Sequence, residues 1–127
     1  TPKNTQNTTS YKQPKINEML LAVGFTPEQA KIMAAVAMAE SAGDPMIDTV
    51  KSGLDPEKKN EFSIGLFQLN MIDAFLEERL KLFGIESTDE LYNPIVNVIA
   101  AKRLFDQQGF NAWSAYNNDS YKKFLTN

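Results

Sequence analysis

The stretch IMAAVAMAES at residues 32–41 decides the fold of this chain. Eight consecutive apolar residues precede Glu40 and have no polar side chain among them. A helix that is apolar on every side is buried on every side, so this segment predicts a helix at the centre of the molecule.

Clear signals mark both ends of this predicted helix. Thr26 is a good N-cap, Pro27 suits the first helical position, and Gln29 completes a capping box with Thr26. Gly43 and Pro45 predict the end of the helix.

Glu40 is the unusual residue of this segment. Acidic side chains are rare at buried positions unless they are paired or functional. Desolvation and the negative end of the helix dipole both raise the pKa of a carboxyl group there. A proton retained nearer neutral pH is what a general acid needs. The alternative is that Glu40 simply reaches the surface as the helix ends.

The rest of the chain predicts a mainly α domain over residues 14–127, after a flexible tail or linker at 1–13 that has one aromatic and no aliphatic residue. Residues 43–62 are polar and predict one irregular loop or small hairpin after the central helix. Further helices are predicted at 14–23, 71–83, 94–108 and 112–116, with a short turn from Ser87, a last helix from Ser120, and N-caps at Asn93 and Asn111.

Composition excludes several kinds of chemistry. The chain has 127 residues, no cysteine and no histidine, which removes disulfides, thiolate or imidazole metal sites and a Ser-His-Asp triad. A net charge of −3 argues against nucleic-acid binding. No apolar run reaches the roughly 20 residues that span a bilayer. We expect neither a metal nor a cofactor.

Three segments carry a family pattern in their order and spacing. They are AMAESAG at residues 37–43, SIGLFQLN at 63–70 and AYNN at 115–118. A buried helix ending in Glu-Ser, then Gly-Leu-x-Gln, then Ala-Tyr-Asn resembles the lysozyme-like lytic transglycosylases, including those carried on phage virions. The resemblance covers about residues 18–125 and implies a lysozyme-like fold with helices around a glycan-binding cleft.

The resemblance also implies an activity. The expected reaction cleaves the β-1,4 bond between N-acetylmuramic acid and N-acetylglucosamine in peptidoglycan. Glu40 acts first as acid and then as base, and the product is a 1,6-anhydro sugar. The implied substrate-binding residues are Ser41, Ser63, Gln68, Asn70, Tyr116 and Asn117. Two of them have structural alternatives: Ser41 can satisfy the hydrogen bonds of the helix end, and Asn117 can cap its loop.

The expected partner is a peptidoglycan glycan strand, and the expected location is a phage virion or another site facing the cell wall, within a larger virion or secretion-machine protein. A hydrolytic lysozyme is an alternative. Such an enzyme uses a second carboxylate, which lies about 5–5.5 Å or about 6.5–9.5 Å from the first. A non-catalytic glycan-binding module and a small helical interaction protein are further alternatives. The candidates for a second carboxylate, which also fit a solvated loop, are Asp44, Asp48, Asp55, Glu57 and Glu61.

Overall fold

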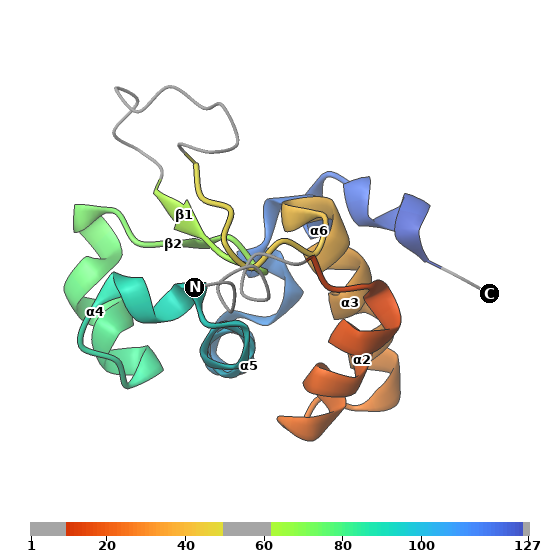
Figure 1. The fold of residues 1–127 in the computed structure, drawn as a ribbon, viewed down its shortest axis with the longest axis horizontal. Helices are drawn as coiled ribbons and strands as arrows, with labels where there is room; N and C mark the ends of the chain where they lie inside the picture. Colours follow the sequence, from red (N-terminus) through yellow and green to blue (C-terminus); the bar gives the residue numbers. More distant parts are fainter. Residues whose placement is uncertain (1–9, 50–61, 126–127) are drawn as a thin grey trace, which may run out of the picture.

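The computed structural model describes residues 10–49 and 62–125, and it is mainly helical with one two-stranded antiparallel sheet (Figure 1). The predicted fold class is confirmed. The elements are α2 (Gln13–Ala22), α3 (Pro27–Ser41), β1 (Ser63–Ile64), β2 (Leu69–Asn70), α4 (Asp73–Phe83), η1 (Thr88–Tyr92), α5 (Pro94–Gln108), η2 (Gly109–Ala112), α6 (Ser114–Asn117) and η3 (Ser120–Phe124), where η marks a 3-10 helix.

Helix α3 is the long apolar helix that its sequence predicts, and its middle is buried. The capping box is present, because Gln29 N donates to the Thr26 hydroxyl and the Gln29 side chain accepts from Thr26 N. Residues 33–37 are all buried, and α3 packs against α2, α6 and η3. The helix ends at Ala42 in the left-handed conformation (φ 55°), one residue before the predicted Gly43.

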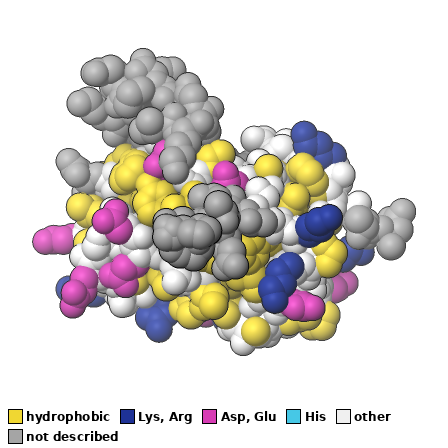
Figure 2. Space-filling view, viewed as in Figure 1, with side chains coloured by type: hydrophobic (Ala, Val, Ile, Leu, Met, Phe, Trp, Pro, Cys, Tyr) yellow, Lys and Arg dark blue, Asp and Glu magenta, His cyan; other side chains and the backbone are white. Residues whose placement is uncertain are grey.

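Two groups of helices flank the centre of the molecule. Helices α2 and α3 lie on one side, α4 lies on the other, and α5 runs between them (Figure 1). The acidic side chains of the face in view gather mostly on the side of α4, and many of the Lys and Arg side chains of this face lie towards α2 and the C-terminal end (Figure 2). In the part of the chain that the structure describes, no helix is both long and apolar enough to cross a bilayer.

The small hairpin lies at Ser63–Asn70, after the predicted loop at 43–62 rather than within it. Ser63 pairs with Asn70, and Ile64 pairs with Leu69. The start of the loop joins the edge of this hairpin, since Asp48 forms a bridge to Ile64 and Thr49 N donates to Ser63 O at 3.1 Å.

Near the chain ends, several helices begin at other residues than the sequence predicts. The first helix begins at Gln13, and Tyr11 before it is half-buried and donates its N–H to Gly43 O at 2.7 Å. Of the expected tail at 1–13, residues 1–9 lie outside the described residues. The predicted cap at Asn111 is wrong, because residues 109–112 form η2 and α6 begins only at Ser114. The predicted last helix is the 3-10 helix η3.

Candidate active site

Glu40 lies in the last turn of α3 and is half-buried. Ala115 N, from the start of α6, donates a hydrogen bond of 3.2 Å to Glu40 Oε2. This contact fixes one carboxylate oxygen against a helix 75 residues away in sequence. A backbone N–H favours the negative oxygen, whereas the C-terminal end of α3 disfavours it, so the surroundings of Glu40 oppose one another.

A cavity of about 220 Å³ opens beside Glu40. Its lining combines the end of α3, both strands of the hairpin, the turn between them and the segment that leads into α6. The lining residues are Glu40, Ser63, Gln68, Asn70, Ala112, Trp113 and Ser114. The structure therefore brings four of the seven predicted site residues to one cavity, namely Glu40, Ser63, Gln68 and Asn70.

The turn that carries Gln68 is held by the buried side chain of Asn97 in α5. Asn97 Oδ1 accepts from Phe67 N at 3.0 Å, and its Nδ2 donates to Ile64 O at 3.0 Å and to Leu91 O at 2.9 Å. Asn97 is fully buried, so water is not at hand to replace these hydrogen bonds. Loss of one of them would leave a buried polar group without a partner, which is costly. One side chain thus fixes the shape of the turn.

Gly65 lets the turn approach Asn97 this closely. Its φ is +79°, and a Cβ there would lie 2.6 Å from Leu91 O and against Asn97 Nδ2. A residue with a side chain would be strained at this φ, and its Cβ would clash with these atoms, so the turn requires glycine here.

Trp113 fixes the other side of the same turn. Its indole Nε1 donates to Phe67 O at 3.0 Å, and its ring meets the Phe67 ring edge-on with centroids 6.0 Å apart. Trp113 is 3% exposed, yet it also lines the cavity.

Gln68 adopts a strained backbone conformation at this site. Its φ is +46°, which is uncommon for a residue other than glycine. Its side-chain Nε2 donates to Ile47 O at 3.1 Å and to Gly65 O at 3.0 Å. The amide nitrogen therefore joins the loop to the turn, and strain of this kind often occurs at binding sites.

Asn70 and Ser63 face each other across the hairpin as the paired residues of β1 and β2. Asn70 Oδ1 accepts from Phe62 N at 3.0 Å and from Ile72 N at 3.3 Å. Ser63 is 2% exposed. Both side chains are positioned by the hairpin itself.

The other three predicted residues, Ser41, Tyr116 and Asn117, are not among the described residues that line this cavity. Ser41 is buried and satisfies the helix end, donating to Ala37 O at 2.9 Å and accepting from Gly43 N at 3.2 Å. Tyr116 stacks between two aromatic rings. Asn117 Nδ2 donates to Asn111 O at 2.9 Å on the surface. Substrate contact by Ser41, Tyr116 or Asn117 stays a prediction.

Two of the second-carboxylate candidates have described positions. Asp44 accepts from Met46 N at 2.9 Å, and buried Asp48 accepts from the Tyr92 hydroxyl at 2.6 Å. Neither is among the described residues that line the cavity at Glu40. Asp55, Glu57 and Glu61 lie outside the described residues.

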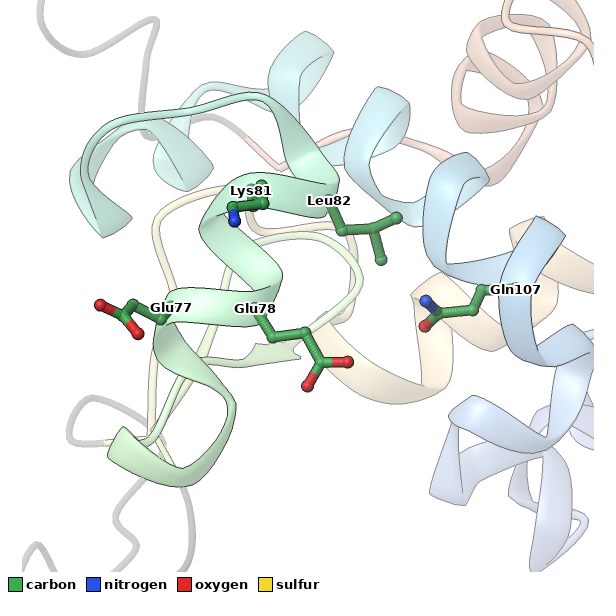
Figure 3. Close-up of a pocket in the computed structure, with 5 residues that line it drawn as sticks. All are labelled: Glu77, Glu78, Lys81, Leu82 and Gln107. Carbon is green, nitrogen blue, oxygen red and sulfur yellow. The ribbon is translucent and has the colours of Figure 1, made fainter.

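A larger hollow of about 600 Å³ lies elsewhere, between α4 and the end of α5. Glu78 and Leu82 point from α4 towards Gln107, whereas Glu77 points to the other side of the helix (Figure 3). It is open and shares no lining residue with the cavity at Glu40. Within residues 10–49 and 62–125, no group of three or more acidic side chains could hold a metal ion.

Sequence reasoning missed five residues of the site, and three of them, Ala112, Trp113 and Ser114, line the cavity. The Ala115 N–H has no side-chain signal, and Ser114 is an ordinary helix-start residue. Asn97 did carry a signal, since it is the one polar residue in the otherwise apolar first half of α5, at residues 94–101.

Comparison with known proteins agrees with this architecture. A family model described as a lysozyme-like domain matches residues 17–115, which span α2 to the first residues of α6. A search of curated proteins found no match. The family match supports a glycosidase that acts on peptidoglycan. Since the match covers well over half of the sequence, the chain belongs to the family of lysozyme-like domains.

Proposed function

We propose that this protein is a lytic transglycosylase that cleaves the N-acetylmuramic acid–β-1,4–N-acetylglucosamine bond of peptidoglycan with Glu40 as its general acid and base. One observation carries the proposal. Glu40 is the only acidic side chain among the described residues that line the cavity, and the other polar side chains are a hydroxyl or an amide. Such groups bind sugar hydroxyl and acetamido groups without adding charge.

The proposed reaction needs a single carboxyl group. The Glu40 carboxyl donates its proton to the glycosidic oxygen as the bond from that oxygen to C1 of the muramic acid breaks. The resulting carboxylate then removes a proton from the 6-hydroxyl of the same sugar, and the 6-oxygen bonds to C1. Glu40 thereby regains the proton that it donated. The substrate's own acetamido group shields the cationic C1 between the two steps.

The surroundings of Glu40 support this assignment. Ala115 N–H holds Oε2 in place, and the carboxyl group lines the cavity. A carboxyl group fixed in this way can exchange a proton with a ligand in the cavity.

Substitution Glu40→Gln tests the assignment. It keeps the shape of the side chain and removes the proton donor, so release of soluble fragments from cell walls should fall by about 10²–10⁴-fold. Glu28→Gln is the matched control, since Glu28 lies in the first turn of the same helix, away from the cavity. Circular dichroism verifies that both variants fold.

Mass spectrometry of the fragments identifies the reaction. Anhydro ends support transglycosylation, whereas reducing ends would show hydrolysis by a second carboxylate. Full activity in Glu40→Gln would exclude Glu40 as the acid. Glycan binding by the parent protein without any fragment release would show a non-catalytic module.

A further inference from the structure

The cavity at Glu40 continues into a second cavity. The second has a volume of about 200 Å³, and both are lined by Gln68, Asn70, Ala112 and Trp113. The second cavity leads from these shared residues to the first half of α4, where Arg79 joins its lining. The two cavities are therefore neighbours along one wall of the molecule, and together they are named the groove.

Arg79 gives the far end of this groove a positive charge. It is the only basic side chain among the described residues that line either cavity, as Glu40 is the only acidic one. Among the side chains that the structure describes, none forms an ion pair with Arg79. Glu78, its neighbour in α4, attracts this charge without forming an ion pair with it.

The guanidinium group of Arg79 is held in place from two sides. Its NH1 donates to Asn70 O at 2.9 Å, and its central carbon lies 4.5 Å from the centroid of the exposed Phe75 ring. Arg79 is half-buried, and this burial lowers its pKa. A guanidinium has five N–H donors in a flat fork, so one bond to Asn70 O leaves donors for a ligand.

A flat, fixed and partly desolvated guanidinium is suited to a carboxylate. The sugars of a peptidoglycan strand are uncharged, and the carboxylates of the intact wall belong to the peptide stems on its muramic acid residues. We infer that Arg79, held by Phe75 and Asn70 O, binds a carboxylate of the peptide stem when a glycan strand lies in the groove. This inference rests on the proposed function of the Glu40 site.

Binding of three defined tetrasaccharides tests the inference. They are a peptidoglycan fragment with its stems, the same fragment after an amidase has removed the stems, and a tetramer of N-acetylglucosamine without any carboxylate. Titration calorimetry is carried out in the Glu40→Gln background, so that no ligand is cleaved. Arg79→Gln should weaken binding of the stem-bearing fragment by about tenfold, which is a typical loss for a hydrogen bond to a charged group. Binding of the N-acetylglucosamine tetramer should not change.

Arg103→Gln is the matched control. Arg103 is exposed, its NH1 also donates to a backbone carbonyl (Leu82 O, 3.2 Å), and it lines neither cavity of the groove among the residues described. This variant should bind all three ligands as the parent does.

Three results would overturn the inference. Equal losses for all ligands would show that Arg79 only supports the hairpin through Asn70 O. An equal loss for the stem-bearing and stripped fragments, with none for the tetramer, would show that Arg79 contacts the lactyl group, which both fragments carry, rather than a carboxylate of the stem. No loss, or no binding of the stem-bearing fragment by the parent background, would remove the subsite. Failure of the parent protein to release fragments contradicts the proposed catalysis instead, and leaves this binding test intact.

Discussion

Replacement of Asn97 by alanine should be among the most destabilising single changes in this domain. The variant loses three hydrogen bonds, to Phe67 N, Ile64 O and Leu91 O, in a place where Asn97 is 0% exposed. Each bond contributes about 1 kcal/mol net, and each stranded buried group adds to the loss. We therefore expect the free energy of unfolding to fall by about 3–5 kcal/mol, out of a total of about 5–15 kcal/mol for a domain.

Urea denaturation followed by far-UV circular dichroism measures this loss. The melting temperature should fall by about 10–20 °C in parallel. Asn111→Ala is the matched control, because Asn111 is exposed and only its backbone oxygen makes a hydrogen bond that the structure gives; its cost should stay within about 0.5 kcal/mol. A loss below about 1 kcal/mol for Asn97→Ala, with an unchanged dependence on urea, would refute the view that this side chain holds the turn.

Two other predictions concern the same region. Tyr92→Phe removes the hydroxyl that donates to Asp48 and should cost about 1.5–3 kcal/mol at neutral pH, measured by urea denaturation. Burial and, after it, the bond to Asp48 raise the pKa of Tyr92, so the folded state holds this proton more tightly than the unfolded state does. The free energy of unfolding should therefore decline as the pH rises above about 10. This decline should be smaller in Tyr92→Phe than in the parent protein. Gly65→Ala should cost clearly more than Gly84→Ala: both have positive φ and share a strain of about 1–3 kcal/mol, but a Cβ at Gly65 would also lie 2.6 Å from Leu91 O, against 3.4 Å to the nearest atom at Gly84. Equal melting temperatures for the two glycine variants would contradict this reasoning.

Helix α3 could be predicted because its signals are local. The capping box at Thr26 and the apolar run that follows need no information from the rest of the chain. The same holds for α5, which begins at Pro94 after the Asn93 cap as predicted.

The start of α6 could not be predicted because a distant contact sets it. Trp113 adopts an extended conformation (φ −111°, ψ 126°), which separates η2 from α6. Its indole donates to Phe67 O, 46 residues away, so tertiary structure overrides the local preference for one continuous helix.

The site shows the same division between local and distant information. The structure brings Glu40, Ser63, Gln68 and Asn70 together, and each lies in a segment whose residue types were distinctive. The Ala115 N–H at Glu40 could not be inferred, because every residue except proline has a backbone N–H and only the fold selects one.

The position of Trp113 gives the protein an internal optical probe. The chain has one tryptophan, and this residue lines both halves of the groove while it contacts the turn beside Gln68. All tryptophan emission therefore originates at the surface where we propose that sugar is bound. An unlabelled sample can report occupancy of the groove through a change in emission, in real time and for every variant that retains Trp113.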